Sequence, residues 1–415
     1  CISVSCILGD KHMRIIQINS TCGIGSTGKI AVGISRLLTQ SNADNYIFCS
    51  FQSSKYPLGI QFCNKSYTNI QAMQSYFFGN YGFNSVAITK RMVSEIERLN
   101  PDIVHLHNIH GHDCNLEILF SYFKERKIKL IWTFHDCWAF TGYCTYFSMN
   151  DCNKWKNECE KCTQRSTYSL LFDRSNELFH RKKRLFDGLD MTIVTPSIWL
   201  ADIVKQSFLK DYPIEVINNG IDLEVFKPIS SDFKQKHHIP NKKSVVLGVA
   251  FYWDARKGLD FFTALSQRLD KEKYQIVLVG IDKRIERQLP NNIITINRLQ
   301  SQSELAAIYS SSDVYVNPTR EDNYPTVNIE SLACGTPVLT FRTGGSPEML
   351  DETCGSVVEC GDIDALESEI IRICTDKPYS REACIRKAKA FDKNERYKEY
   401  LKLYERINTA GAEGN

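Results

Sequence analysis

Two carboxylates and a helix start mark the part of the chain best suited to chemistry. Asp322 and Glu330 stand eight positions apart, after an apolar run at 313–317 and before a second one at 337–341. The residues between the runs predict a loop and then a helix that Gly335 ends, so the unit is open at the carboxyl end of its first strand. The first-turn amides of a helix have no partners within it, and they direct the positive end of the helix dipole at such an opening. This arrangement predicts an anion site.

A diphosphate suits the helix start, and a carboxylate on the same helix suits a sugar. We expect Glu330, on the buried side of the helix, to accept hydrogen bonds from paired hydroxyls such as those of ribose. We expect the diphosphate to bind where the helix begins, at Tyr324, Pro325, Thr326 and Val327.

Adjacent cations precede another predicted helix. An apolar strand at 244–251 leads into a loop that carries Arg256 and Lys257, and a helix is expected after Gly258. Cations in a strand–loop–helix setting are typical of a phosphate site, although two solvated cations on a loop are the alternative. We expect Lys257, with Arg256, to stabilise developing negative charge.

A literal G-x-G-x-x-G at 23–28 follows the first predicted strand. A dinucleotide-binding oxidoreductase would need an acidic residue at the end of the next strand, 46–51, to hold the ribose. That strand contains no acidic residue, because Asp44 precedes it. We therefore favour a loop whose backbone at Gly25 and Ser26 approaches a phosphate.

Histidines gather after the strands predicted at 102–106 and 130–134. The first strand opens into HLHNIHGHD, which contains His105, His107, His110 and His112. Two of them share a strand face, but the others lie on a loop and no plausible metal-ligand set is complete, so a metal site is the weaker alternative. We expect His107 and His110 to line a cleft on the acceptor side and His105 to be structural.

The pair His135–Asp136 follows the second of these strands. Open α/β sheets place their chemistry at the carboxyl ends of their strands, which favours a role for both side chains in the site. A histidine that only satisfies a backbone carbonyl is the alternative for His135.

Length and composition indicate the broad class of protein. A chain of 415 residues is long enough for two domains, and a net charge of +3 is too small to indicate nucleic acid, although it suits an anionic substrate or a membrane surface. No apolar run reaches the roughly 18 residues of a membrane-spanning helix. Residues 1–12 lack the features of a signal peptide, so we expect a soluble, cytoplasmic protein and an N-terminal extension before Met13 with no role in the fold.

Four of the sixteen cysteines form a group in a polar segment that lacks room for a helix or strand of its own. The spacing is C-x7-C-x6-C-x2-C, and the residues are Cys144, Cys152, Cys159 and Cys162. A closed tetrahedral zinc site suits such thiolates, and disulfides or four unlinked thiols are the alternatives. The other cysteines are expected to be mostly buried, reduced thiols.

A basic helix is predicted at 173–186, with a run of four cations at 181–184. It could meet an anionic lipid headgroup or a lipid-linked diphosphate, or it could present a solvated face.

The stretch from 313 to 347, with ACGTPV at 333–338, resembles the nucleotide-sugar signature of the retaining family 4 glycosyltransferases. HDCWAFTG at 135–142 resembles a subgroup of these enzymes that builds bacterial surface polysaccharides. The family usually has Glu-x7-Glu where this chain has Asp322 and Glu330, and an arginine where it has Tyr252. The resemblance covers the chain from Met13 to about Ile407.

The resemblance implies the GT-B architecture, in which two Rossmann-like α/β domains face each other across a donor and acceptor cleft. It implies an acceptor-side domain at 13–222, a nucleotide-sugar-binding domain at 223–383, a C-terminal helix at 384–407 that crosses back onto the first domain, and a tail at 408–415. By resemblance, Leu299 and Gln300 read the base, and His135 lies near the donor sugar.

The expected function is retaining transfer of a hexosyl group from a UDP- or GDP-linked sugar to a glycan or a polyprenyl-diphosphate-linked glycan. We expect capsule, exopolysaccharide or O-antigen synthesis, with peripheral contact at the inner face of the cytoplasmic membrane. The expected catalytic residues are His135, Lys257, Arg256 and Asp322, and Asp136 is placed with the acceptor-side histidines. No cofactor is expected in catalysis. A nucleotide-sugar epimerase of the same fold and a noncatalytic sugar-binding or scaffold protein are the alternatives.

Overall fold

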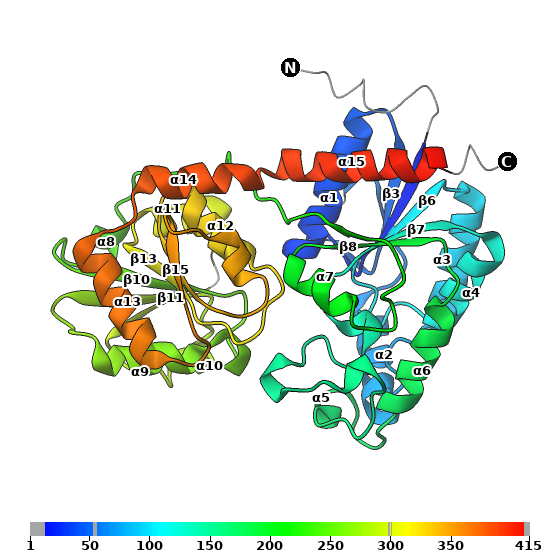
Figure 1. The fold of residues 1–415 in the computed structure, drawn as a ribbon, viewed down its shortest axis with the longest axis horizontal. Helices are drawn as coiled ribbons and strands as arrows, with labels where there is room; N and C mark the ends of the chain where they lie inside the picture. Colours follow the sequence, from blue (N-terminus) through cyan, green and yellow to red (C-terminus); the bar gives the residue numbers. More distant parts are fainter. Residues whose placement is uncertain (1–12, 53–55, 298, 300, 411–415) are drawn as a thin grey trace. The chain divides into compact units, whose positions relative to one another are not determined.

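The chain forms two units in the computed structural model, which describes residues 13–52, 56–297, 299 and 301–410 (Figure 1). Unit 1 ends at Asn218 and takes up the chain again from Asn394, and unit 2 is Asn219–Lys393. Each unit is a parallel sheet with helices on both faces, which confirms the predicted α/β fold. The extension predicted at 1–12 and the end of the predicted tail lie outside the described residues.

The sheet of unit 1 has seven parallel strands in the order β5-β3-β1-β6-β7-β8-β9. They are β1 (Arg14–Ile18), β3 (Asp44–Cys49), β5 (Gly59–Gln61), β6 (Ile103–Leu106), β7 (Lys129–Thr133), β8 (Met191–Thr195) and β9 (Ile214–Val216). A small second sheet joins β2 (Thr21–Cys22) to β4 (Phe51–Gln52). The chain leaves β1 toward β3 on one side and returns to β6 on the other. This reversal makes the carboxyl ends of β1 and β6 the place where such sheets bind ligands.

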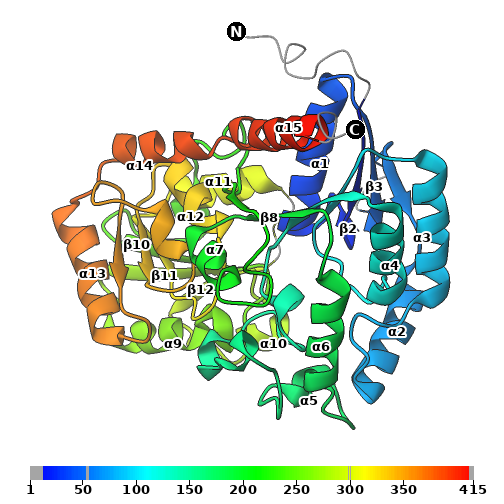
Figure 2. The same cartoon turned by 45° about the vertical axis from the view of Figure 1, so that its right-hand side comes forward.

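Helices cover both faces of this sheet, as Figures 1 and 2 show. They are α1 (Gly25–Gln40), α2 (Lys65–Phe78), α3 (Val86–Leu99), α4 (Leu116–Arg126), α5 (Arg165–Tyr168), α6 (Ser175–Phe186), α7 (Ile198–Val204) and α15 (Lys393–Ala410). Short 3-10 turns are η2 (Trp138–Phe140), η3 (Ser148–Asn150) and η4 (Lys154–Lys156). Apolar residues of α1 and α15 pack on one face and those of α3, α4 and α6 on the other.

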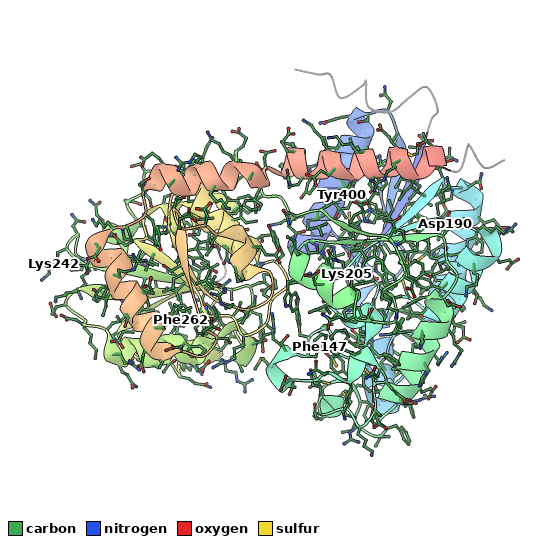
Figure 3. The ribbon with its side chains drawn as sticks, viewed as in Figure 1. Phe147, Asp190, Lys205, Lys242, Phe262 and Tyr400 are labelled. Atoms are coloured by element: carbon green, nitrogen blue, oxygen red, sulfur yellow. The ribbon has the colours of Figure 1, made fainter. Side chains whose placement is uncertain are left out.

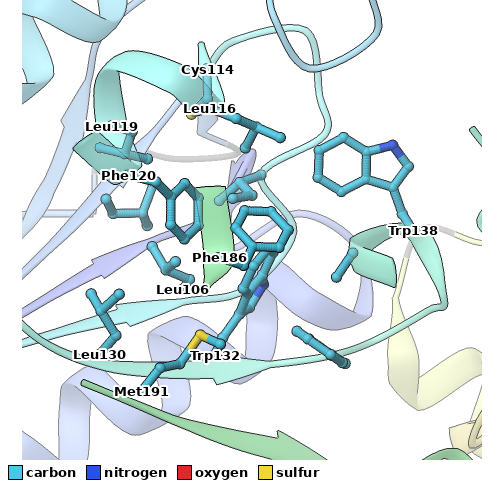
Figure 4. Packing of buried hydrophobic residues seen from close by; sticks show 14 of the residues in the cluster. Leu106, Cys114, Leu116, Leu119, Phe120, Leu130, Trp132, Trp138, Phe186 and Met191 are labelled. Atoms are coloured by element: carbon cyan, nitrogen blue, oxygen red, sulfur yellow. The ribbon is translucent and has the colours of Figure 1, made fainter. Parts of the chain in front are cut away.

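Strands that are buried on both faces explain why these segments are apolar without alternation. In β1, Ile15 packs toward α1, whereas Ile16 and Ile18 pack in the opposite cluster. In that opposite cluster, shown in Figure 4, the ring of Trp132 lies 5.4 Å from Phe120 and 5.1 Å from Phe186. Strand and helix aromatics therefore join the two layers.

Helix α15 is bound to unit 1 by buried tyrosines. Its Tyr400, labelled in Figure 3, has its hydroxyl 3.2 Å from Thr133 Oγ1, and its Tyr404 has its hydroxyl 2.7 Å from His105 Nδ1. His105 also lies 2.8 Å, through Nε2, from Thr133 Oγ1. Both ring nitrogens of the fully buried His105 thus have partners inside unit 1, which gives this residue the structural role expected for it.

The sheet of unit 2 has six parallel strands in the order β12-β11-β10-β13-β14-β15, with its own reversal between β10 and β13. The strands are β10 (Ser244–Val249), β11 (Tyr274–Val279), β12 (Ile293–Ile296), β13 (Val314–Asn317), β14 (Val338–Phe341) and β15 (Gly355–Val358). Its helices and 3-10 turns are α8 (Phe233–Lys236), η5 (Ala255–Lys257), α9 (Leu259–Arg268), α10 (Lys283–Glu286), α11 (Gln302–Ser310), α12 (Thr326–Ala333), η6 (Ser346–Met349), α13 (Ile363–Asp376), α14 (Arg381–Ala388) and η7 (Lys389–Phe391).

Two apolar layers enclose this sheet. Val245 and Leu247 of β10 pack with residues of α11, α12 and α14, whereas Val246 packs with α9 and α13 on the other face. Phe262 of α9, labelled in Figure 3, is fully buried in the second layer.

The unit boundaries differ from the predicted ones at two places. Ile221, expected in the first domain, bridges to Asp392 and packs in the core of unit 2. The helix predicted at 384–407 is divided, because Cys384 of α14 is fully buried in unit 2 and only α15 continues onto unit 1. A continuous charged segment conceals this division, since the buried cysteine gives no distinct signal in the sequence.

The basic run of α6 is mostly occupied by contacts within unit 1. Arg181 pairs with Glu117 and lies over the ring of Phe83, 3.8 Å from its centroid. Lys182 is fully buried and donates hydrogen bonds to the carbonyls of Trp138 (2.7 Å) and Thr141 (3.1 Å). Only Lys183 and Arg184 of the four cations are exposed, so this helix is a weaker membrane-contact surface than its sequence indicates.

Candidate active site

Cations and carboxylates meet at the carboxyl edge of the unit 2 sheet, where its strand order reverses. Lys257 follows β10, Asp322 follows β13, and their side chains form an ion pair. Arg256 donates through Nη1 to the carbonyl of Glu321 at 3.0 Å. The loops after the two central strands are therefore joined through side chains that the sequence predicted to act on a phosphate.

Glycines allow the close approach of these loops. Gly344 has φ 53°, and a Cβ there would collide with the carbonyl oxygen of Asp322. Gly258 has φ 74°, and a Cβ there would collide with the carbonyl oxygen of Pro318. L-residues with side chains rarely adopt this backbone region, so the chain needs glycine at both positions.

Helix α12 begins beside the ion pair and carries Glu330. Its N-cap is Pro325, as predicted, and no acidic residue lies in its first turn. Tyr309 donates its hydroxyl to Glu330 Oε2 at 3.4 Å. Burial raises the pKa of Tyr315 well above its usual value, and the negative charges of Glu330 and Asp322 raise it further. The phenol of Tyr315 is therefore neutral. Leu299, expected to read a base, packs against the apolar cluster of unit 2 that contains Tyr309 and Tyr315.

A hydrogen-bonded chain of three side chains orients His135 in unit 1. Gln17 Nε2 donates to the carbonyl of Ala31 at 3.0 Å, which turns Gln17 Oε1 toward His107 Nε2 at 3.0 Å. His107 Nδ1 in turn lies 3.2 Å from His135 Nε2. Since an amide oxygen only accepts, His107 carries its proton on Nε2, and His135 Nε2 is the donor to His107 Nδ1. This assignment leaves a lone pair on His135 Nδ1.

His107, expected to line a cleft on the acceptor side, lies in the interior of unit 1. His107 is 1 % exposed, and both of its ring nitrogens have partners within unit 1. Burial lowers the pKa of His107 well below its usual value and that of His135 to about 4. Both rings are therefore neutral near pH 7, and His107 acts as a positioning residue for His135.

His110 and Asp136 form a charged pair beside these neutral rings. His110 Nε2 lies 2.8 Å from Asp136 Oδ2. Burial alone would lower the pKa of His110, but the charge and hydrogen bond of Asp136 outweigh it and raise that pKa above its usual value. Burial likewise opposes ionisation of Asp136, whereas the charge and hydrogen bond of His110 leave its pKa below the usual range.

Tyr81 holds the other side of His110. Its hydroxyl donates to the His110 carbonyl at 2.9 Å and lies 3.1 Å from His110 Nδ1. The hydroxyl proton is thus directed at the carbonyl, and the hydroxyl oxygen accepts from Nδ1–H of a protonated ring.

The glycine loop lies at the same edge of the unit 1 sheet. Gly25 has φ 66° and opens α1, whose N-cap Ile24 makes no side-chain capping bond. Gly25 and Ser26 are exposed, and the first turn contains no acidic residue. A Cβ at Gly28 would lie only 2.8 Å from Thr21 Oγ1, which accounts for the third glycine of the motif.

The four clustered cysteines are brought near one another but remain free thiols. Cys144 and Cys162 share a hydrogen bond that lowers the pKa of Cys162 to about 7, and the charges of Cys152 and Cys159 also act on Cys144. Among the described residues, no three His, Cys, Asp or Glu side chains are arranged as a metal-ligand set. Zinc binding by these four cysteines therefore stays a prediction. Metal analysis of the purified protein tests it, and the absence of zinc would remove it.

Comparisons with known proteins assign both units to one class of enzyme. Residues 29–225 match the family described as Glycosyltransferase Family 4, and residues 230–391 match Glycosyl transferases group 1. The chain belongs to these glycosyltransferases. This assignment favours a transferase over the two alternatives, a nucleotide-sugar epimerase and a noncatalytic protein.

Three relatives of this glycosyltransferase are distant in sequence but match along their whole length. The putative colanic acid biosynthesis glycosyl transferase WcaC of Escherichia coli (strain K12) is 23% identical over 435 residues, with 95% of this chain and 100% of WcaC covered. Sucrose-phosphate synthase from Thermosynechococcus elongatus has a TM-score of 0.69 at 16% identity and coverage of 96% and 100%. Anabaena Alr3699/HepE in complex with UDP-glucose has a TM-score of 0.66 at 13% identity and coverage of 97% and 100%. The structural matches confirm the GT-B fold.

Sequence reasoning missed several residues that shape the sites of this glycosyltransferase. Gln17 is the one fully buried polar residue of the strand RIIQI, and a polar residue between apolar strand residues is a signal that sequence reasoning could have used. Lys182 follows Leu178 at helical spacing on the buried side of α6, which indicates burial despite its charge. Tyr81 and Tyr315 have no local signal, because their partners are distant in the sequence.

Proposed function

We propose that this glycosyltransferase moves a sugar from a nucleoside diphosphate to a hydroxyl of a glycan or polyprenyl-diphosphate-linked glycan, with retention of anomeric configuration. UDP and GDP are the candidate carriers. The product would be a surface polysaccharide of the capsule, exopolysaccharide or O-antigen kind. The relative named for colanic acid biosynthesis and the structural relative that binds UDP-glucose support this proposal.

The observation that carries the proposal is the joined pair of loops in unit 2. Lys257 and Arg256 stand with the start of α12 at the strand-order reversal, and Glu330 follows on the same helix. Such a group can bind a diphosphate through two cations and helix amides, and a ribose through a carboxylate. Asp322 holds the Lys257 ammonium in place until a phosphate competes for it.

In the proposed reaction, the bond from the anomeric carbon to the leaving phosphate oxygen breaks as the acceptor oxygen bonds to the same face of that carbon. The leaving oxygen takes the acceptor proton. Lys257, Arg256 and the helix amides stabilise the negative charge on the diphosphate, at about 3 kcal/mol for each donor. The backbone N–H groups at Gly25 and Ser26 are proposed to help stabilise the same negative charge.

Neutral His135 is proposed to orient the donor sugar. Its Nδ1 lone pair can accept a hydrogen bond from a sugar hydroxyl, because the chain through His107 and Gln17 fixes the proton on Nε2. His110 and Asp136, whose side chains are 19 % and 12 % exposed, are proposed to contact the acceptor.

Thermal-shift and hydrolysis assays against UDP- and GDP-sugars test the proposal. A ligand that binds only the folded state raises the melting temperature. We expect one donor to stabilise the wild-type protein and to be slowly hydrolysed, and Glu330→Ala and Lys257→Ala to lose both effects. If no nucleotide sugar has any effect, the proposed donor class is wrong.

A further inference from the structure

Eight exposed apolar side chains of unit 1 come from two short segments that lie together. They are Ile70, Met73, Tyr76, Phe77 and Phe78 of α2, and Leu170, Leu171 and Phe172 after α5, each between 38 % and 55 % exposed. We call these eight residues the apolar patch. The backbone N–H of Leu170 donates to the carbonyl of Tyr76 at 2.7 Å, which joins the two segments. The patch holds eight of the fifteen large exposed hydrophobic side chains in the described part of the chain.

Helix α2 is oriented opposite to an ordinary surface helix. Its inward side is polar: Gln71 accepts from the backbone N–H of Ser85 at 3.0 Å, and Ser75 accepts from Asn84 Nδ2 at 2.8 Å. Ile70, Met73 and Phe77, at helical spacing, point outward. A helix in contact with water normally buries its apolar stripe, so this orientation indicates a nonaqueous environment for the outer face.

The charges around the patch identify its partner. Neither α2 nor the segment 161–172 contains an aspartate or glutamate, whereas they carry Lys65, Lys161 and Arg165. The acids that flank this second segment are Glu160, next to Lys161, and Asp173, which accepts hydrogen bonds from the backbone N–H groups of Cys162 and Ser175. Aromatic and aliphatic side chains on two segments that carry three cations and no acids suit the interface of an anionic bilayer.

We propose that the apolar patch docks unit 1 on an anionic lipid bilayer. Phe, Leu and Met side chains enter the region between headgroups and acyl chains, and the basic residues meet the anionic headgroups. No helix within the described residues is long and apolar enough to span a membrane, so docking is at the surface. A protein partner or a second copy of the chain would not require these two segments to be free of acidic residues.

The patch is joined to the acceptor-side pair by short connections. Tyr81, three residues beyond α2, holds His110, and the rings of Tyr81 and Tyr168 stack at 5.8 Å two residues before Leu170. Docking would therefore bring His110 and Asp136 close to a lipid-borne acceptor. This last step rests on the proposed function, whereas docking itself does not.

Vesicle flotation of the full chain tests the docking. We compare vesicles of phosphatidylcholine with vesicles that also contain phosphatidylglycerol, for the wild type, Leu171→Ser with Phe172→Ser, and Ile70→Ser with Phe77→Ser. Ile371→Ser, which changes an exposed residue of α13 in unit 2, is the matched control. We expect each patch pair to weaken binding to anionic vesicles about tenfold or more, with the control unchanged. Lys65→Glu with Lys161→Glu should reduce the preference for anionic vesicles.

Two further measurements keep the test decisive. Equal melting temperatures and equal donor hydrolysis in all variants would exclude misfolding, and hydrolysis also reports on the proposed function separately. Binding that the patch variants leave unchanged, or no vesicle binding by the wild type, would overturn the proposal. Sedimentation that shows a dimer lost in the patch variants, without vesicle binding, would assign the patch to a second copy of the chain.

Discussion

The two units place different chemistry at the same position of the same kind of sheet. In unit 2 the carboxyl edge carries an ion pair, Lys257–Asp322, and a helix start that attracts anions. In unit 1 it carries neutral His107 and His135 next to one charged pair, His110–Asp136. One edge is suited to holding a fixed negative charge, and the other to accepting and donating hydrogen bonds without net charge.

This difference shows how one architecture supplies two functions. A transfer reaction needs positive charge where the leaving group accumulates negative charge, and it needs uncharged, oriented groups where hydroxyls are positioned. Burial supplies the second property, because it lowers the pKa of each histidine that has no acidic partner. The comparison predicts that variants of the two edges will fail in different ways.

Removing the positive charge of Lys257 in unit 2 should have the largest effect on activity. We expect Lys257→Met to reduce kcat/KM by about 10²–10³-fold, because one preorganised donor to the leaving charge is lost. The same variant should lose stabilisation by the donor in thermal-shift assays. Lys271→Met, which changes an exposed lysine of unit 2, is the control and should keep wild-type values. Full activity in Lys257→Met would show that the ion pair with Asp322 is only structural.

His135 should separate the two edges most clearly. We expect His135→Asn to reduce kcat by about 10²-fold, comparable to the loss of one well-placed catalytic group. Donor stabilisation should persist, because the proposed phosphate and ribose contacts lie in unit 2. Steady-state kinetics and thermal shift on the same preparation check both statements. If donor stabilisation disappears with activity, donor binding depends on the sugar contact of His135 and the division of tasks is wrong.

A smaller effect should follow from the residue that fixes the proton of His135. Gln17→Leu removes the acceptor for His107 Nε2–H and leaves that group and the Ala31 carbonyl without their partner. We expect about a tenfold loss of kcat with an unchanged donor KM, and about 1–3 kcal/mol less stability from the unpaired buried groups. The pH dependence of kcat should also change, because the tautomer of His135 is no longer imposed. A stability loss with wild-type kcat and pH profile would make Gln17 structural only.

Several elements could be predicted from sequence because their signals are local. The βαβ unit around Asp322 and Glu330, the start of α12 at Pro325 and the glycine loop at 23–28 each have turn residues and apolar runs in sequence. The fold class followed from the same alternation.

Contacts between distant segments could not be predicted in this way. Nothing near His107 indicates that Gln17, ninety residues earlier, would bury and orient it. The run at 181–184 has the composition of a basic surface, yet the apolar spacing of α6 buries Lys182 over the ring of Trp138. The side of α2 that faces inward is set by its tertiary hydrogen bonds, because a single polar and apolar pattern is compatible with either orientation.

Lowering the pH should destabilise unit 1 more than unit 2. Of the effects predicted here, this one should be the smallest. Burial lowers the pKa of His105 to about 3 and those of His112 and His135 to about 4, against about 6.5 in an unfolded chain. Between about pH 6.5 and 4 the unfolded state therefore binds protons that folded unit 1 does not, and stability falls as pH falls.

The stability contributions of the charged pair His110–Asp136 depend on pH differently, and that of His110 has the opposite sign to those of the neutral histidines. His110 has a raised pKa, so its contribution is complete below the unfolded value and is lost only as pH rises through the folded value. Asp136 has a lowered pKa, so its contribution is lost only as pH falls through that lowered value. Neither group fully offsets the four neutral histidines, His105, His107, His112 and His135, across the mildly acidic range, since these four together take up more protons on unfolding.

Unit 2 contains only His237 and His238 among the described histidines, and burial, with the charges of His238 and Lys236, lowers the pKa of His237. Hydrogen exchange read by mass spectrometry at pH 7 and pH 5 should therefore show earlier loss of protection in β6 and β7 than in β10 and β13. His135→Asn should reduce the acid sensitivity of unit 1 and leave that of unit 2 unchanged. Equal loss of protection in both sheets would mean that the buried histidines take up protons without unfolding, and that the edge of unit 1 is charged, like that of unit 2.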